Sequence, residues 1–264
     1  MLKDYIAVIG QGAASYRESL AALCDAVLVL PPARGMDSRV ASHPDMLMMA
    51  IGRDVAVPAS YAARADVQPI LNTLRQRCGI RVTTTETSPG NTYPHDVACN
   101  GLLCGGKLYG KLSALAPEIL RLADDSGIEA VNVAQGYAGC SALACGDILL
   151  TADPSVRNAV SERNGSVLLL SPGGIDLPGY DTGFIGGAGG YADGHAVFFG
   201  DVRRHPDGDR ITQALSARGI VCHCLGEREL TDFGGIKFFF CRAELRLSEK
   251  CGTMRIDSQR EVIL

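Results

Sequence analysis

The stretch "CSALACGDILLTADPSVRNAVSERNGSVLLLS", residues 140–171, contains one full copy of the pattern that decides the fold. It predicts two short strands on either side of Gly146-Asp147, then a helix, and then a third strand, "SVLLLS". Asp153 is placed to cap the helix, and Pro154 takes its first position. The stretch is therefore a strand–strand–helix–strand unit.

The same order of elements recurs along the chain. "HPDMLMMAIGRDVAVPA" turns at Gly52 and leads to the helix in "ARADVQPILNTLRQRCG" and the strand "IRVTTTE". "DVACNGLLCGGKLYG" turns at Gly105 and leads to "SALAPEILRLADDSG", a helix with Ser113 as its N-cap, and the strand "IEAVNVA". "GYADGHAVFFGD" turns at Gly194 and leads to "GDRITQALSARG" and "IVCHCLG". The sequence thus predicts four complete units.

The two ends of the chain supply a fifth unit. "DYIAVIG", "SYRESLAALCD" and "AVLVLPP" give a strand, a helix and a strand, and the missing strand is "GGIKFFF", near residues 234–240. Pairing of the last strand with the first would leave no open edge between units. We therefore expect a single α/β domain, residues 1–264, whose five units form a ring closed by the C-terminal strand.

A dinucleotide-binding fold is the rival interpretation. "AVIGQGAASYRESL" has the strand, the glycine turn and the helix, but Ser15 stands where the third glycine is needed. The following strand, "AVLVLPP", ends in prolines instead of the acid that holds a ribose. The repeat therefore outweighs this short motif.

Composition narrows the class of protein. The 264 residues carry a net charge of −4, so no basic excess favours nucleic acid as a partner. No apolar run is long enough for a membrane span, and the N-terminal residues lack the pattern of a signal peptide. Ten cysteines without an export signal indicate reduced thiols in the cytoplasm, and their spacing favours small buried side chains over a metal site. We expect no metal and no cofactor.

Five strand–strand–helix–strand units in a ring resemble the pentein fold, the five-bladed α/β propeller of the guanidino-group-modifying enzymes. That superfamily includes arginine deiminases, dimethylarginine hydrolases, agmatine deiminases and amidinotransferases, and the chain looks like an uncharacterised bacterial branch of it. The resemblance implies a site on the axis, where the first strand of each unit begins. It also implies a cysteine that attacks the guanidinium carbon, a histidine that moves protons, and carboxylates that hold the guanidinium.

The unit entrances offer the residue types that this chemistry needs. They read "ASHPDML", "TYPHDVA", "YAGCSAL", "GGYADGH" and "DFGGIKF". Their acids, histidines and one thiol are His43, Asp45, His95, Asp96, Cys140, Asp193, His195 and Asp232.

Roles follow from the resemblance. Asp45, Asp96 and Asp193 would converge on a small cationic ligand. His95 or His43 would serve as acid and base, and Cys140 would be the nucleophile. The loop "PPARGMDSRVASHPDM" adds Arg39, which could bind a carboxylate of the substrate.

The last strand departs from the superfamily pattern. The resemblance expects the thiol there, after the glycine pair, but "GGIKFFFCRAEL" has Ile236, Lys237 or Phe238 at that place. Two functions therefore stay open. One is a hydrolase that acts through Cys140 on C–N bonds of a guanidino or amidine metabolite. The alternative is a noncatalytic pentein that binds a small ligand.

Overall fold

The structure is a computed structural model that describes residues 1–88 and 90–241. It is a mixed α/β fold of many small sheets, and within the described residues five of these sheets have three strands each. In order across each sheet, the strands are β17 (Lys237–Phe240), β1 (Tyr5–Gly10) and β2 (Ala26–Leu30); β3 (Met49–Ile51), β4 (Asp54–Pro58) and β5 (Arg81–Thr85); β6 (Leu102–Cys104), β7 (Lys107–Gly110) and β8 (Glu129–Asn132); β9 (Ala142–Cys145), β10 (Ile148–Thr151) and β11 (Ser166–Leu169); β13 (Gly189–Ala192), β14 (His195–Phe198) and β15 (Val221–Cys224).

All five sheets share one pairing pattern. The middle strand pairs antiparallel with one neighbour and parallel with the other, as β10 does with β9 and β11. The antiparallel pair is a hairpin in four sheets, whereas β1 pairs with β17 from the other end of the chain, with Ile6 opposite Phe239. A sixth, two-stranded parallel sheet joins β12 (Ile175–Asp176) to β16 (Leu230–Thr231).

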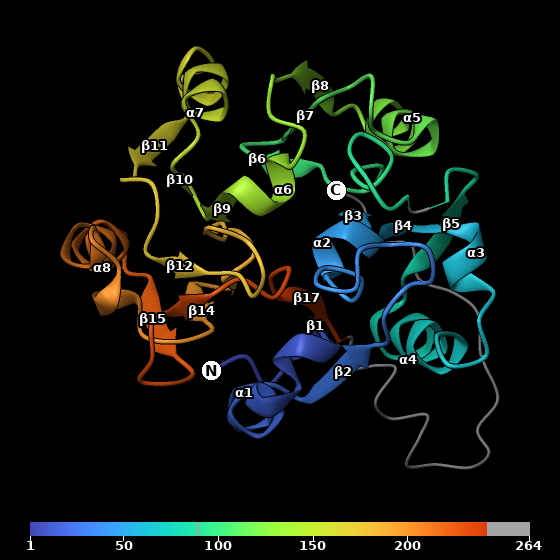
Figure 1. Cartoon of the computed structure of the whole chain (residues 1–264), viewed down its shortest axis with the longest axis horizontal. Coiled ribbons are helices and arrows are strands. Elements are labelled where there is room, and N and C mark those ends of the chain that lie inside the picture. The colour runs from blue at the N-terminus through green and yellow to red at the C-terminus, as the bar shows by residue number, and fades with distance from the viewer. Residues whose placement is uncertain (89, 242–264) are drawn as a thin grey trace, which may run out of the picture.

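The helices fall into two groups (Figure 1). Those on the outside link the parallel strands, and the short α2 and α6 lie near the middle of the view. The helices are η1 (Gln11–Tyr16), α1 (Arg17–Leu23), α2 (Pro44–Leu47), α3 (Ala59–Ala62), α4 (Gln68–Cys78), α5 (Pro117–Asp125), α6 (Ala138–Ser141), α7 (Pro154–Ser161), η2 (Val202–Arg204) and α8 (Gly208–Ser216). No helix in residues 1–88 or 90–241 is long and apolar enough to cross a membrane.

Local sequence explains most of these boundaries. The Asp153 side chain accepts a hydrogen bond from the Val156 N–H at 2.9 Å, which confirms the predicted cap of α7. Ser113 does not cap α5, because that helix begins at Pro117, with Ala116 before it. The pyrrolidine ring of Pro117 sets the first helical φ, whereas Ser113 lies in the turn that precedes it.

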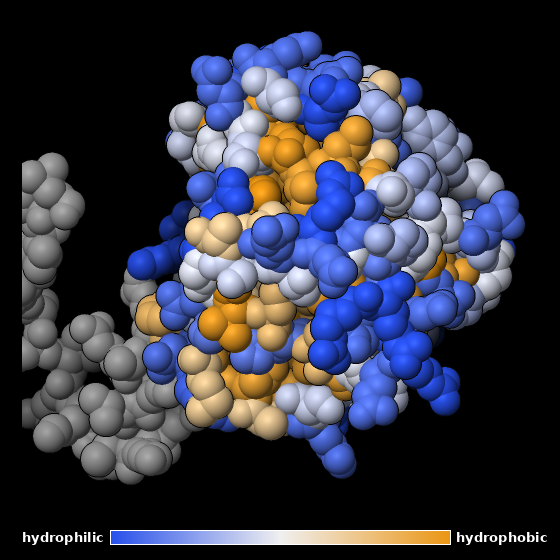
Figure 2. Space-filling model, turned by 90° about the vertical axis from the view of Figure 1, so that its left-hand side faces the viewer, coloured by the Kyte–Doolittle hydropathy of each residue, from blue (hydrophilic) through white to orange (hydrophobic). Residues whose placement is uncertain are grey.

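The core lies between the sheets and the outer helices. Each long helix buries apolar residues three or four positions apart, which is the spacing of one helical face. These pairs are Leu71 and Leu74 on α4, Ile119 and Ala123 on α5, Val156 and Val160 on α7, and Ile211 and Leu215 on α8. Some apolar surface stays outside: Leu169 on β11 is 36% exposed and Val221 on β15 is 49% exposed. Figure 2 shows the face that lies on the left in Figure 1, where hydrophobic patches lie between polar side chains.

The pairing of β17 with β1 gives a test of the fold. The Cys241 N–H donates to the Asp4 carbonyl at 2.7 Å, and bonded pairs alternate along an antiparallel ladder. Phe239 therefore faces Ile6 in a bonded pair, whereas the N–H of Phe240 points away. Phe239→Pro should lose a ladder bond and a buried ring, and cost more than about 3 kcal/mol of unfolding free energy in urea.

Phe240→Pro is the matched control. Phe240 is 56% exposed, and its ring contacts Tyr5 edge to face, so this change should cost only about 1 kcal/mol. Equal losses in the two variants would contradict the pairing.

Candidate functional site

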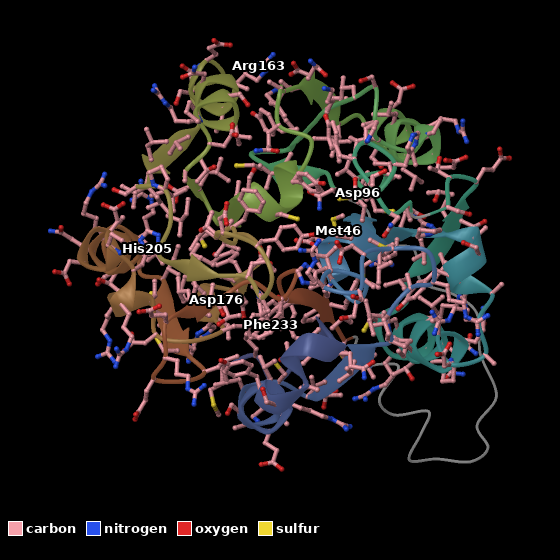
Figure 3. The ribbon with its side chains drawn as sticks, viewed as in Figure 1. Met46, Asp96, Arg163, Asp176, His205 and Phe233 are labelled. Atoms are coloured by element: carbon pink, nitrogen blue, oxygen red, sulfur yellow. The ribbon has the colours of Figure 1, made fainter. Side chains whose placement is uncertain are left out.

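The candidate site is a pocket of about 240 Å³ between the loops that precede the first strands of several sheets. We call it the acidic pocket. It is lined by Val40, His43, Met46, Asp96, Tyr137, Cys140, Leu177, Tyr180, Thr182, Phe184 and Asp232. In Figure 3, Met46 and Asp96 lie close together toward the middle of the molecule, whereas Arg163 and His205 lie nearer its edge.

Cys140 is on α6, and Asn100 holds it in place. The Asn100 side chain is fully buried, and its Oδ1 accepts the N–H groups of Gly139 at 2.8 Å and Cys140 at 3.1 Å. Its Nδ2 lies 2.9 Å from the Cys140 Sγ and 3.2 Å from the Asp45 carbonyl. One buried amide therefore fixes both the thiol and the backbone of α2. Burial and the negative charges of Asp45 and Asp232 raise the pKa of the Cys140 thiol well above its usual value.

Asp232 is 2% exposed and follows β16. Its two oxygens accept N–H groups of Phe184 at 2.9 Å and Gly234 at 3.0 Å. These bonds favour the charged carboxylate, but burial and the nearby charge of Asp45 oppose it more strongly and raise the pKa of Asp232 to about 7. The carboxyl group is therefore poised to lose its proton near neutral pH.

Asp45, on α2, is the least satisfied charge in the pocket region. It is 2% exposed, and neither oxygen has a hydrogen-bond partner among the described residues. An unpaired buried carboxylate is costly, so the arrangement favours a cation that would pair with it.

His43 is also buried, with 5% of its surface exposed. Its Nδ1 lies 3.8 Å from an oxygen of Asp232. Burial lowers the pKa of the imidazole, and the charge of Asp45 opposes that shift. A neutral imidazole can accept or return a proton, and His43 lines the same pocket as the Cys140 thiol.

Aromatic rings surround the outer acid. Asp96 accepts a hydrogen bond from the Tyr137 hydroxyl at 2.8 Å, and its other oxygen is buried without a partner. Tyr137 stacks with Phe184, with ring centres 6.4 Å apart, and tilts against Tyr93 at 5.8 Å. Such walls exclude water and suit a flat cation.

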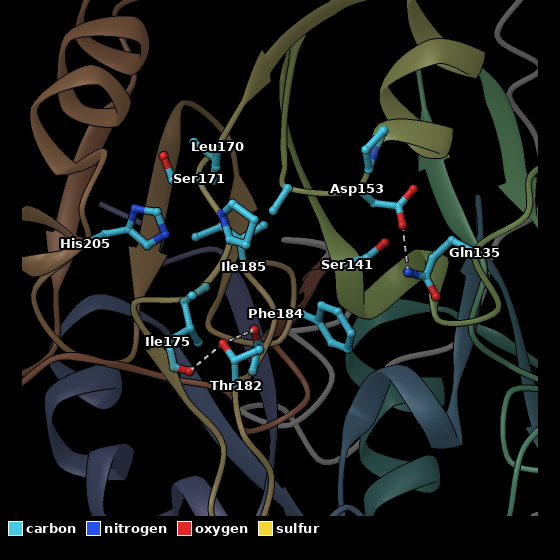
Figure 4. Close-up of a pocket in the computed structure, with 15 residues that line it drawn as sticks. Gln135, Ser141, Asp153, Leu170, Ser171, Ile175, Thr182, Phe184, Ile185 and His205 are labelled. Carbon is cyan, nitrogen blue, oxygen red and sulfur yellow. Dashed lines mark hydrogen bonds between the residues drawn. The ribbon is translucent and has the colours of Figure 1, made fainter.

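A second cavity, of about 180 Å³, shares Thr182 and Phe184 with the acidic pocket (Figure 4). Its polar groups have partners within the protein. Asp153 accepts from Gln135 at 2.8 Å as well as from the helix it caps, and the His205 Nδ1 accepts the Asp207 N–H at 3.0 Å. Among the described residues that line this cavity, no buried side-chain oxygen or nitrogen lacks a hydrogen-bond partner, whereas both Asp45 oxygens lack one. In the described part of the chain, no three His, Cys, Asp or Glu side chains are arranged to hold a metal ion.

The structure brings together Cys140, His43, Asp45 and Asp96, but it does not bring the other predicted site residues to them. Asp193 is exposed in the two-residue turn between β13 and β14, with φ of +46°. An Asp-Gly pair with positive φ at both positions forms the tight turn of a hairpin. This turn lies at the end of β13 remote from the entrance, so the expected convergence of Asp193 with Asp45 and Asp96 is wrong.

His95 and Arg39 also differ from the expectation. His95 is exposed in the loop before Asp96, and its side chain does not line the pocket. Arg39 is bound by its own protein: its Nε donates to Asp37 at 2.9 Å, its Nη2 pairs with the same carboxylate, and its Nη1 donates to the Gly179 carbonyl at 2.6 Å. Its positive charge is therefore already paired with Asp37, and Arg39 is not among the residues that line the pocket.

Sequence reasoning missed Asn100 and Tyr137. Asn100 stands in "VACNGLL", directly before a first strand, as Cys140 and Asp45 do. That shared position could have predicted that Asn100 lies at the site. Tyr137 precedes α6 and carried no signal beyond its place in "GYAGC".

Comparison with known proteins agrees with this architecture. The family described as "Family of unknown function (DUF6873)" matches residues 8–237. No curated protein matches the chain. A solved dimethylarginine dimethylaminohydrolase adduct is similar at 13% identity, with a TM-score of 0.52, over 85% of this chain and 92% of that one.

Two further structures are similar. AgrE, in a ternary complex with ornithine and NAD+, has 12% identity and a TM-score of 0.53 over 89% of this chain and 38% of its own. The product-bound N-terminal domain of ArgZ, an arginine dihydrolase from cyanobacteria, has 12% identity and a TM-score of 0.50 over 83% and 90%. At these identities the likeness concerns the fold alone, and it confirms that the fold resembles that of a dimethylarginine dimethylaminohydrolase, as the sequence predicted.

The buried acids give a prediction about stability. Because the folded-state pKa of Asp232 is raised to about 7, the folded state holds a proton that the unfolded state releases, and stability falls as pH rises through about 4 to 7. Asp45→Asn removes the charge that opposes ionisation of Asp232. The variant should melt higher than wild type at about pH 8, by roughly 2–4 °C per kcal/mol recovered, with a smaller difference at about pH 5.

Asp193→Asn is the control, because Asn-Gly forms the same turn as Asp-Gly. It should match wild type at both pH values in thermal unfolding followed by circular dichroism. A lower melting temperature for Asp45→Asn at about pH 8 would refute the electrostatic argument.

Proposed function

The chain belongs to the Family of unknown function (DUF6873), and we propose, from the geometry of its acidic pocket, that it binds a small guanidinium- or amidinium-bearing metabolite and hydrolyses one of its C–N bonds with Cys140. The observation that carries the proposal is the buried Asp45 carboxylate. Among the described residues no cation pairs with it, and its charge raises the pKa of the Cys140 thiol and of Asp232. A guanidinium is a planar set of donors that pairs with carboxylates, and its charge would offset these buried acids.

Binding of the cation would also prepare the thiol. In the protein alone, Asp45 and Asp232 oppose formation of a second negative charge at Cys140. A bound cation reverses that field and lowers the pKa of the thiol, so the thiolate forms where its substrate already is. His43 is the nearby base that takes the proton.

The reaction then follows in two stages. The Cys140 sulfur bonds to the central carbon, a C–N bond breaks, and the amine leaves with the proton that His43 returns. Water, deprotonated by His43, adds to the same carbon and expels the thiolate. The thiolate then takes back a proton from His43, so the thiol and the neutral imidazole are restored. The products are a ureido compound from a guanidinium, or an amide from an amidinium, and an ammonium or alkylammonium ion, and the net reactants are the cation and water.

The fold of the proposed enzyme is a five-bladed α/β propeller. We assign each three-stranded sheet to one blade of a single domain, and the pairing of β17 with β1 supports closure by the C-terminal strand. The axis would then lie near α2 and α6, which carry Asp45 and Cys140.

A noncatalytic pentein that binds a small cation is the second candidate. It is favoured by the surroundings of Cys140: among the described residues that line the pocket there is no lysine or arginine to stabilise a thiolate. The thiol contacts the neutral amide of Asn100 and the Met46 sulfur, and its interaction with the Asp45 side chain raises its pKa further.

Turnover assays separate the two candidates. Wild type should release ammonia or amine from at least one of arginine, agmatine and methylated arginines, with a matching ureido product. Cys140→Ser should abolish turnover, a loss of about 10⁴-fold or more, while calorimetry shows unchanged binding. Cys224→Ser, an exposed thiol on β15, is the control and should keep full activity.

Binding without product in wild type would select the noncatalytic candidate. Absence of binding for every guanidinium and amidinium compound would refute both.

A further inference from the structure

The charges around the acidic pocket define its ligand more narrowly than the proposed function does. The lining includes Asp96 and Asp232 and one imidazole, His43, with Asp45 buried behind them. No lysine or arginine lines it within the described residues. Resting on the proposed function, we infer that the ligand is an alkylguanidinium whose tail carries no carboxylate, and that Arg39 is a strap that closes the pocket mouth.

Arg39 joins two loops that lie far apart in the sequence. It belongs to the loop before α2, and its Nη1 donates at 2.6 Å to the carbonyl of Gly179, 140 residues away. Its guanidinium also lies 4.0 Å from the ring centre of Tyr180, which lines the pocket and is 43% exposed. These contacts hold the second loop against the first at the place where the pocket meets solvent.

Asp37 neutralises the strap. Its carboxylate pairs with the Arg39 Nε and Nη2 and accepts a hydrogen bond from the Tyr180 hydroxyl at 3.1 Å. The bonds from Arg39 hold the pKa of Asp37 well below its usual range, so the pair stays intact at neutral pH. A substrate carboxylate would therefore meet a guanidinium whose charge Asp37 already balances, and would be repelled by that carboxylate.

Apart from Asp96, Asp232 and His43, the pocket lining is uncharged. Val40, Leu177 and Phe184 line the pocket beside Tyr180. Lys111 is a further cation in this region. Its Nζ lies over the ring of Tyr93, which packs against Tyr137, but neither Lys111 nor Tyr93 lines the pocket. A carboxylate on the ligand tail would meet Asp37 and Asp96 with no free cation to pair with, whereas an alkyl tail would gain apolar contacts.

An isosteric pair of ligands tests the inference on the full-length wild-type protein. Pentylguanidine and δ-guanidinovalerate share the guanidinium and the chain, and they differ in a methyl group against a carboxylate. Calorimetry should give a dissociation constant at least about tenfold lower for pentylguanidine, since like charges in contact cost several kcal/mol. Equal affinities, or tighter binding of δ-guanidinovalerate, would overturn the inference and leave the proposed function standing. Failure of both ligands to bind would overturn both.

Two variants test the strap. Arg39→Ala removes the guanidinium. Gly179→Ala keeps the guanidinium but adds a methyl group 2.5 Å from the Arg39 Cδ, at a residue with φ of +86°, where a side chain is strained. Both variants should weaken the two ligands by the same factor and so leave the affinity ratio at its wild-type value. Selective loss of δ-guanidinovalerate in Arg39→Ala would show a carboxylate clamp and overturn the inference.

Discussion

Asp45 and Asp232 are buried with no lysine or arginine paired to them among residues 1–88 and 90–241, and the centre of the structure depends on this constraint. Each buried charge costs several kcal/mol unless it is paired. At Asp232, hydrogen bonds from the N–H groups of Phe184 and Gly234 stabilise the carboxylate and offset part of that free energy. The backbone of Gly187 also lies against this carboxylate. Only glycine fits there, because a Cβ at residue 187 would lie 1.8 Å from an Asp232 oxygen. Asp45 receives no such hydrogen bonds from the described backbone, and this is the reason for proposing a cationic ligand.

The site is assembled from several repeats and has no linear motif. Four of the five first strands are preceded by residues that contribute one or two of these side chains: His43 and Asp45 before β3, Asn100 before β6, Cys140 before β9, and Asp232 before β17. Asn100 joins two of these contributions, since it bonds to the backbone of Asp45 and to the sulfur of Cys140. A change in one unit therefore alters the environment of its neighbours.

This construction explains which features the sequence could predict. Hairpins at Gly52, Gly105 and Gly194 follow from local turn chemistry, and so does the cap at Asp153, because neighbouring residues decide them. Placement in the pocket depends on contacts between units. The acids at the unit entrances include Asp45 and Asp96, which lie at or near the pocket. They also include Asp193, which lies instead in the hairpin turn after β13. Arg39 carried the right charge for a clamp, but its partner, Gly179, is 140 residues away.

The last strand shows why the thiol stands elsewhere in this chain. The glycine pair at 234 and 235 is present, and Gly234 takes φ of +80° to bring its backbone against His43. Ile236, which follows, packs with Ala192 and Val197 in the core and is 5% exposed. Its N–H donates to the Gly189 carbonyl at 2.9 Å, so the strand is committed to packing and pairing. Under the proposed function, the nucleophile must then come from another unit, and Cys140 on α6 is the candidate. The Asn100 amide contacts its sulfur, and the nearby charges of Asp45 and Asp232 oppose the thiolate unless a cation binds.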